Sequence, residues 1–430
     1  MPEFRRAPRI PLLARPADLS AAVARLLVVI TGLNLNGFTY MMTGLEQAFS
    51  PVLLAGSCYL VLGFGRWAVR DSTVIAFAAA IFLYLAFGTF FSGIDAPEAQ
   101  FQHSLTYASS VLLLVGMAAF VSSRSNEREI LSFVRFTKYT LVLSCVSVLF
   151  SHELHSLYTI PLSSMDRNAG LFGNANEAGI TSAITLALVL SFPERRVFVN
   201  IAHALITLAA VGLSFSKSSM LVTVIILLVH ALRMRSLAHI LLPAAALTVI
   251  GAFLVHPVAF SSLSISQQAR LDQLPALLSG EITDETTTGR TSLWSLALDR
   301  IESNFPWGSG LGQFHHMVGG TLHEDVWMGA HNSYLMVWGE AGLLAFVALV
   351  AASAIMLVRS WHWRFVALPL LYFIVLQFDL LSAHNVLGLR FHNLMMGLCF
   401  GILCWLSRSH TNLERHSLVP RRAAVPGAAP

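Results

Sequence analysis

The chain has 430 residues, of which 55% are hydrophobic and only 12% are charged, and its formal net charge is +4. Soluble domains carry about 25% charged residues, so this composition excludes a soluble protein and predicts one that crosses a membrane several times. The small positive charge gathers in short loops between apolar runs, and it does not indicate nucleic-acid binding.

Apolar runs long enough to cross the bilayer core as helices recur along the chain. We predict an all-α polytopic fold of about twelve transmembrane helices, forming a single transmembrane domain over residues 1–406. One large outer loop, residues 256–330, is predicted to contain short helices. Residues 407–430 are predicted to be a disordered, basic cytoplasmic tail. The predicted spans are 20–38, 48–68, 72–92, 104–122, 130–151, 175–193, 197–214, 216–233, 236–255, 330–358, 362–382 and 386–406.

Arginine pairs separate alternate spans, as Arg66 with Arg70 and Arg195 with Arg196 illustrate. Loops rich in Lys and Arg stay in the cytoplasm, so both termini are predicted to be cytoplasmic. This orientation leaves six cations outside: Arg167, Lys217, Arg270, Arg290, Arg300 and Arg390. For Arg270, Arg300 and Arg390, a solvated surface charge explains the outer position as well as a functional role does.

The loop before the sixth span is rich in glycine and asparagine between Arg167 and Gly179. This composition predicts tight turns. Asn176 is a candidate cap for the sixth span, with Glu177 in the first turn. The same rigid loop would hold Arg167 where it can meet an anion, and the capping role does not compete with that one.

The large outer loop carries a predicted short helix that begins near Thr288, with Arg290 in its first turn. Its apolar stripe recurs at helical spacing and consists of Leu293, Trp294, Ala297 and Ile301. A glycine-rich turn over residues 304–312 ends this helix. No strand precedes that turn, so it is not a dinucleotide-binding fingerprint.

His331 lies where the loop re-enters the membrane, beside Asn332 and Ser333 at the start of the tenth span. One interpretation is a capping or interfacial histidine, and the other is a general base in a partly dry site. The remaining loop histidines lack the spacing of a metal site, and no metal or cofactor is predicted. These histidines are His315, His316 and His323, near Glu324 and Asp325.

The sixth, eighth and tenth spans all run from outside to inside, so their N-termini face outward. Polar segments open them: residues 174–177, 214–219 and 331–333. Helix N-termini attract anions through free N–H groups and the helix dipole. If the three ends converge, they form a site for a phosphorylated ligand, with Arg167, Lys217 and Arg290 adding charge.

At these residues the chain resembles the O-antigen ligase and O-antigen polymerase superfamily of bacterial membrane glycosyltransferases. Two positions depart from the family pattern: Ala175 stands where Asn-Pro-Asn is frequent, and Lys217 stands where Arg is frequent and loses its bidentate fork. The resemblance rests on RNAGLFGNANEAG (167–179), SFSKSSM (214–220), TGRTSLW (288–294), NFPWGSGLGQF (304–314) and AHNSYLMVWGEAG (330–342).

The resemblance implies a bacterial inner-membrane enzyme whose active site faces the periplasm. Its donor would be a glycan linked to undecaprenyl diphosphate, in a membrane-lipid environment. His331 would deprotonate the acceptor hydroxyl for inverting transfer, and Arg290 and Arg167 would bind the diphosphate. The implied reaction needs neither metal nor ATP. The implied substrate-binding residues are Lys217, Asn174, Asn176, Asn332, Ser333, Trp294 and Glu340, although a buried structural role explains Glu340 equally well.

The branches of this superfamily differ in the acceptor that receives the glycan. A ligase uses lipid A-core, a polymerase uses another lipid-linked repeat, and a third branch glycosylates protein. The short chain with one dominant loop favours an O-antigen ligase. A lipid-linked sugar transporter is the rival from another class, because acidic residues inside spans mark transport pathways. Glu340 and Asp379 are the acidic candidates in the second half.

Overall fold

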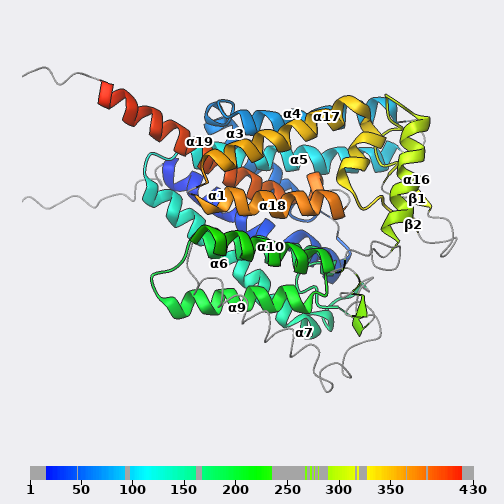
Figure 1. Cartoon of the computed structure of the whole chain (residues 1–430), viewed down its shortest axis with the longest axis horizontal. Helices are drawn as coiled ribbons and strands as arrows, with labels where there is room; N and C mark the ends of the chain where they lie inside the picture. The colour runs from blue at the N-terminus through cyan, green and yellow to red at the C-terminus, as the bar shows by residue number, and fades with distance from the viewer. Residues whose placement is uncertain are drawn as a thin grey trace, which may run out of the picture.

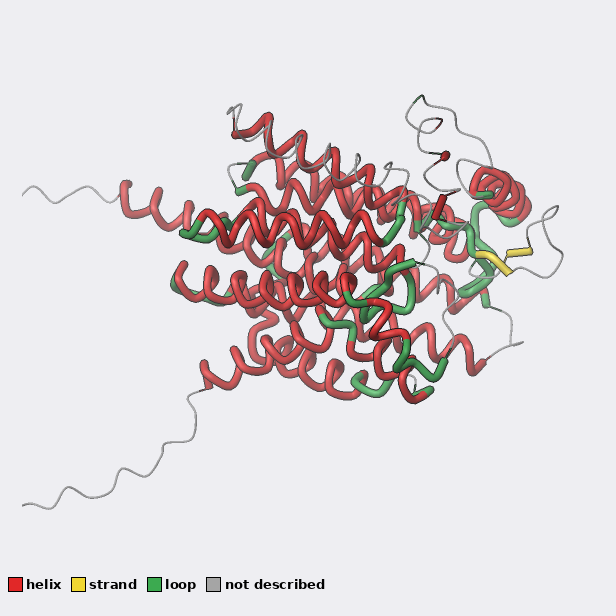
Figure 2. The backbone as a smooth tube through the Cα atoms, turned by 90° about the horizontal axis from the view of Figure 1, so that it is seen from below, coloured by secondary structure: helices red, strands yellow, loops and turns green. Residues whose placement is uncertain are grey.

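The computed structural model describes residues 16–45, 47–92, 97–160, 167–234, 267–268, 272–273, 276, 279, 289–314, 317–318, 327–364, 366–383 and 386–418. Over these residues the chain is a bundle of helices, with one short two-stranded sheet (Figures 1 and 2). The helices are α1 (Pro16–Gly32), α2 (Leu35–Thr43), α3 (Ser50–Ala68), α4 (Ser72–Phe91), α5 (Pro97–Ser122), α6 (Glu127–Leu149), α7 (Ser151–His155), α8 (Ala175–Ser191), α9 (Val197–Leu213), α10 (Lys217–Met234), α16 (Arg290–Ser303), α17 (Ser333–His362), α18 (Ala367–Ser382), the 3₁₀ turn η1 (Val386–Gly388) and α19 (Arg390–Leu418). The strands β1 (Met317–Val318) and β2 (Trp327–Met328) pair antiparallel.

A helix coincides with each predicted span except 236–255, which lies outside the described residues. Among the described helices, five are long and apolar enough to cross a membrane, or six when the bent pair α1–α2 counts as one span. Helices α8, α9 and α18 are apolar but shorter. The all-helical membrane fold is therefore confirmed, and the number twelve stays a prediction.

Two groups of helices build the bundle. In one, α17 packs against α4, and α5 packs against both α3 and α19; in the other, α8 packs against α6, α9 and α10. Helix α18 contacts α17, α8 and α10, and so joins the groups (Figure 1). The core between the helices contains large buried side chains such as Tyr84, Tyr107, Tyr372 and Phe400.

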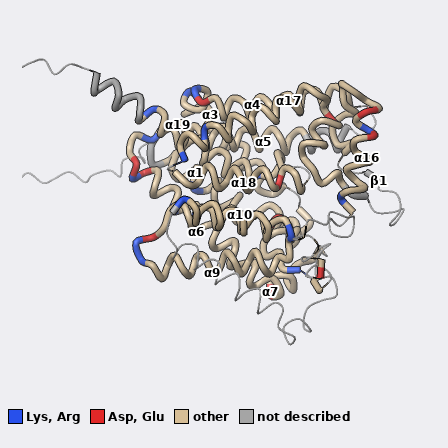
Figure 3. The backbone as a smooth tube through the Cα atoms, viewed as in Figure 1, with Lys and Arg blue, Asp and Glu red and all other residues tan. Residues whose placement is uncertain are grey.

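Lys and Arg gather at the end of this bundle where α19 finishes, while other charged residues lie at the opposite end, beside α16 (Figure 3). At the α19 end, Asp71 caps α4 by accepting from the backbone N–H groups of Thr73 and Val74. Its other oxygen accepts from Arg359 of α17 at 2.6 Å, and the same guanidinium donates to Ser407 of α19. One buried carboxylate thereby ties three helices together, because a buried charge needs partners for all its oxygens.

The predicted loop helix forms as α16 and buries Leu293, Ala297 and Ile301. The glycine-rich turn after it docks on a kink in α17: the Ser309 N–H donates to the Gly339 carbonyl, and the Gly310 N–H donates to the Glu340 carbonyl. At the kink Gly342 has φ 81°, and a Cβ there would lie 2.4 Å from the Trp307 carbonyl oxygen, so only glycine fits. The contact holds α16 against the start of α17.

The predicted tail requires a correction. Helix α19 continues to Leu418, beyond the predicted end of the last span at residue 406. Residues 407–418 are therefore helical rather than disordered, and residues 419–430 lie outside the described residues.

Candidate functional site

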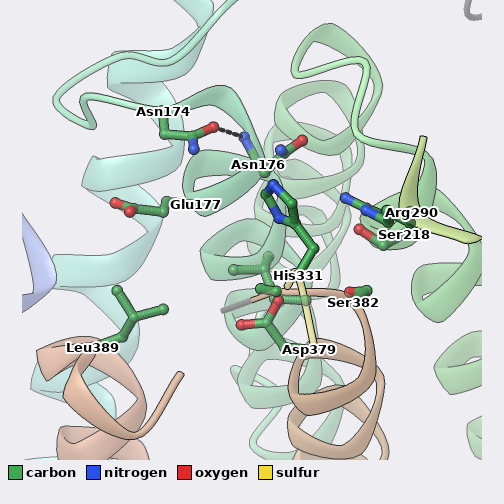
Figure 4. A pocket seen from close by; sticks show the side chains of 11 residues that line it. Asn174, Asn176, Glu177, Ser218, Arg290, His331, Asp379, Ser382 and Leu389 are labelled. Atoms are coloured by element: carbon green, nitrogen blue, oxygen red, sulfur yellow. Dashed lines mark hydrogen bonds between the residues drawn. The ribbon is translucent and has the colours of Figure 1, made fainter. Parts of the chain in front are cut away.

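A cavity of about 110 Å³ lies where several helix ends meet (Figure 4). It has room for several water-sized groups. Most of its lining residues are of polar types, and the lining consists of Asn174, Asn176, Glu177, Ile180, Ser218, Arg290, His331, Asp379, Ser382, Ala383 and Leu389.

This lining brings together helix N-termini whose convergence the sequence left as a condition. Asn176 and Glu177 belong to the first turn of α8, Ser218 to the first turn of α10, and His331 lies two residues before α17. Arg290 is the first residue of α16, so a fourth N-terminus joins them. Four helix dipoles directed at one cavity favour an anion beside Arg290, and the carboxyl groups of Glu177 and Asp379 line the same cavity.

Arg290 and His331 line the same cavity although they lie far apart in the sequence (Figure 4). His331 has φ 47°, a left-handed conformation that is uncommon for a residue other than glycine. Such conformations cost energy and persist where the surrounding structure holds them, often at active sites. The backbone of His331 is thus held in place in the cavity that Arg290 also lines.

Arg167 does not line the cavity itself but contacts Asn176, which does. Its side chain is only 5% exposed, and Nη2 donates to Oδ1 of Asn176 at 3.2 Å. Asn174 caps α8 by accepting from the Asn176 N–H at 2.8 Å, so the predicted cap at Asn176 is wrong and the cap lies two residues earlier. Arg167 therefore adds positive charge behind the wall, and Asn174 and Asn176 form the wall itself.

Lys217 and Trp294 stand next to the site without lining the cavity. The Lys217 ammonium donates to the side-chain oxygen of Gln273, and its neighbour Ser218 takes the place on the wall. Trp294 lies in the second turn of α16, where its indole N–H is buried and has no hydrogen-bond partner among the described residues.

Asn332 and Ser333 hold the segment that carries His331. Asn332 caps α17 by accepting from the N–H groups of Tyr334 and Leu335 at 3.0 and 3.1 Å. The Ser333 hydroxyl donates to the Ala383 carbonyl at 2.8 Å and accepts from the Val386 N–H. These bonds connect the start of α17 with the α18–α19 turn, so both residues orient the site from outside its lining.

Glu340 lies in a separate, fully buried network. Its Oε1 accepts from the Phe314 N–H at 2.8 Å, and its Oε2 accepts from the Tyr84 hydroxyl at 2.5 Å. It is 0% exposed and does not line the cavity. This geometry favours the structural interpretation over substrate binding.

We expect Glu340→Gln to lower stability by about 1–3 kcal/mol, because an amide nitrogen would face a donor that now has an acceptor. The chemistry of the cavity, which Glu340 does not line, should change little. Thermal unfolding of purified protein in detergent measures the loss of stability. The matched control is Glu302→Gln, at an exposed residue of α16. A stable variant that had lost activity would return Glu340 to the substrate-binding residues.

Sequence reasoning missed Asp379 as a site residue and weighed it only as a sign of transport. It lines the cavity, and its Oδ2 lies 2.8 Å from Nε2 of the buried His392, whose Nδ1 lies 3.1 Å from the Tyr372 hydroxyl. A lone acid in an apolar span was the available signal. Ser218, Ser382 and Leu389 gave no such signal. Among the described residues no three possible metal ligands come together.

Residues 202–350 match the model of a family described as O-antigen ligase. This segment belongs to the O-antigen ligase superfamily. Members of the superfamily are glycosyltransferase-like enzymes that act on lipid-linked glycans in a membrane. No curated protein sequence matches the chain significantly.

The O-antigen ligase match contains Lys217, Arg290 and His331 but ends before Asp379 and begins after Arg167 and Asn176. The cavity nevertheless joins residues from inside and outside the matched segment. The superfamily resemblance inferred from the motifs is thus confirmed, and the roles of individual residues stay predictions.

Proposed function

We propose that the chain is a membrane glycosyltransferase that takes a glycan from undecaprenyl diphosphate and transfers it to an acceptor hydroxyl. The observation that carries this proposal is that Arg290 and His331 share one cavity at converging helix N-termini. An anion-binding surface beside a candidate base is what displacement of a diphosphate requires.

In the proposed reaction, His331 takes the proton of the acceptor hydroxyl while that oxygen attacks the anomeric carbon. The bond from this carbon to the diphosphate oxygen breaks, and the configuration inverts. The leaving diphosphate keeps the electron pair, so no general acid is needed. Arg290 stabilises the developing charge directly, and Arg167 adds to the potential through Asn176. No metal and no ATP take part.

We infer that the site faces the periplasm of a bacterial inner membrane and that both termini are cytoplasmic. Support comes from the gathering of Lys and Arg at the end of the bundle where α19 finishes (Figure 3), because such segments stay in the cytoplasm. Lipid A-core is the proposed acceptor, which makes the protein an O-antigen ligase.

We expect purified protein to form product from a lipid-linked polysaccharide donor and lipid A-core in detergent, with EDTA present and ATP absent. Gel separation of the acceptor measures the reaction. In cells, deletion of the gene should leave long polymer on undecaprenyl diphosphate and none on lipid A. Single repeats on lipid A-core would instead indicate a polymerase, and transfer to protein would indicate the third branch.

A further inference from the structure

A cluster of arginine side chains surrounds Trp67, in the last turn of α3, at the end of the bundle where Lys and Arg gather (Figure 3). The Cζ atoms of Arg66 and Arg70 each lie 5.3 Å from the centroid of the Trp67 ring, and that of Arg408 of α19 lies 4.6 Å from it. Cations at such distances are attracted to the face of an indole. One ring therefore gathers three positive charges from two helices.

Helix packing holds the backbones that carry these arginines. Helix α5 packs against both α3 and α19. The Cys404 thiol of α19 lies 3.6 Å from the Trp67 carbonyl oxygen, and Arg408 donates to the carbonyl of Arg124, just beyond α5, at 2.9 Å. The arginines of α3 and α19 are thus brought together by the fold, although they are distant in the sequence.

The acidic groups of the chain do not neutralise this cluster. Over the described residues, no carboxylate forms an ion pair with Arg66, Arg70 or Arg408. Asp71 follows Arg70, but one of its oxygens caps α4 and the other accepts from Arg359. Like charges held close together repel one another, so an anion from outside the chain would stabilise the cluster.

An exposed apolar strip of α3 adjoins the charges. Leu62 is 88% exposed and precedes Arg66 by four residues, so both lie on one face of the helix. Beside it, a Cβ added at Gly63 would meet no atom within 4 Å, so the surface is open there. Helix α3 is long and apolar enough to cross a membrane. Cations at its end, next to an open apolar face, fit a phospholipid whose acyl chains lie along the helix.

The number of cations favours a lipid headgroup with two phosphates. A guanidinium binds phosphate oxygens through its planar fork of donors. Arg66 and Arg70 are both exposed, and neither donates a hydrogen bond to a described residue. Each can therefore take one phosphate, while Arg408 adds a third charge. Basic pockets between transmembrane helices bind cardiolipin, a phospholipid with two phosphates, in this way.

We propose that Arg66, Arg70 and Arg408 around Trp67 form a binding site for a cardiolipin-type phospholipid, in the leaflet that borders this end of the bundle. The lipid neutralises the cluster, connects the ends of α3 and α19 and so stabilises the fold. The site does not depend on the proposed glycosyl transfer, because α16, whose first residue lines the His331 cavity, lies at the opposite end of the bundle (Figure 3).

Lipid titration of delipidated full-length protein in maltoside micelles, followed by native mass spectrometry, measures binding. Cardiolipin should bind about fivefold more tightly than phosphatidylglycerol, which has one phosphate. It should also raise the Tm, whereas phosphatidylcholine and inorganic phosphate should not. Equal affinity for cardiolipin and phosphatidylglycerol would overturn the two-phosphate ligand. Stabilisation by inorganic phosphate alone would overturn a lipid site.

Removing the charges tests the residues. Arg66→Gln combined with Arg70→Gln should weaken cardiolipin binding about 25-fold, from two contacts of about fivefold each. Arg408→Gln should weaken it about fivefold, because α19 supplies the third charge. Arg66→Lys with Arg70→Lys keeps both charges but loses the guanidinium fork, so its affinity should be intermediate.

The matched control is Arg195→Gln combined with Arg196→Gln. It removes the same charge from an exposed pair in the α8–α9 turn, where Arg196 lies 6.0 Å from the Phe198 ring. Affinity for cardiolipin should change less than about twofold. If this control weakened binding as much as the Arg66 and Arg70 pair, only a general attraction between basic loops and anionic lipid would remain, and the site would be wrong.

The Tm without lipid checks that each variant is folded. Should the Arg66 and Arg70 double variant fail to fold, Arg408→Gln carries the test alone. Unchanged cardiolipin affinity in a folded Arg408→Gln variant would overturn the site between α3 and α19, and a loss of about fivefold would support it.

Discussion

Replacing His331 with alanine is expected to lower the rate of glycan transfer about a thousandfold, because a positioned general base contributes roughly 10²–10⁴ in rate. His331 lines the cavity with Arg290, and the bonds of Asn332 and Ser333 fix its backbone. Donor binding should survive, since Arg290 is intact. Single-turnover transfer by purified protein measures the loss.

The left-handed backbone of His331 requires a second variant. Asparagine tolerates this conformation, so His331→Asn keeps the local fold and removes the imidazole. It should be folded and as slow as His331→Ala. Should either variant retain more than about a tenth of wild-type activity, the role of general base would be wrong. The capping or interfacial interpretation would then apply.

Arg290→Gln is expected to lower transfer about 100- to 1000-fold, the usual effect of removing one donor that stabilises developing charge. Arg290→Lys should recover part of this, because it keeps the charge but lacks the bidentate fork. The loss should appear in both kcat and kcat/KM, since the interaction strengthens as the diphosphate leaves. Initial rates over a range of donor concentrations give both values.

Arg300→Gln is the matched control on the same helix. Arg300 lies near the other end of α16 and donates to the backbone and side chain of Gln313, away from the cavity lining. It should retain nearly normal transfer. If Arg300→Gln were as damaging as Arg290→Gln, the effect would reflect the packing of α16 rather than contact with the diphosphate.

The positions of the helices were predictable because a bilayer demands long apolar runs whose backbone bonds are satisfied internally. The stripe of α16 was predictable from its spacing, and burial of Leu293, Ala297 and Ile301 confirms it. The break between α1 and α2 was not, since Asn34 sits within a run that reads as one span. The sequence likewise carried no signal for the continuation of α19 to Leu418.

Individual site residues were predictable where their chemistry is unusual for a membrane protein. Arg290 and His331 stood out as a cation and an imidazole beside predicted helix starts. Asp379 was visible as an acid in an apolar helix, but its partner His392 and its place in the cavity depend on how α18 packs. For Arg390 the sequence supported a surface role as well as a functional one. Its burial beside Gln47 and Ser50 depends on contacts between segments that are distant in the sequence.

By itself the sequence determined the membrane class, the helical periodicity and the superfamily motifs, because these depend on composition and on local spacing. The tertiary structure alone decided that the N-termini of α8, α10 and α16 meet His331 at one cavity, and that Glu340 lies outside it. Contacts between distant segments follow from packing, which local sequence does not encode.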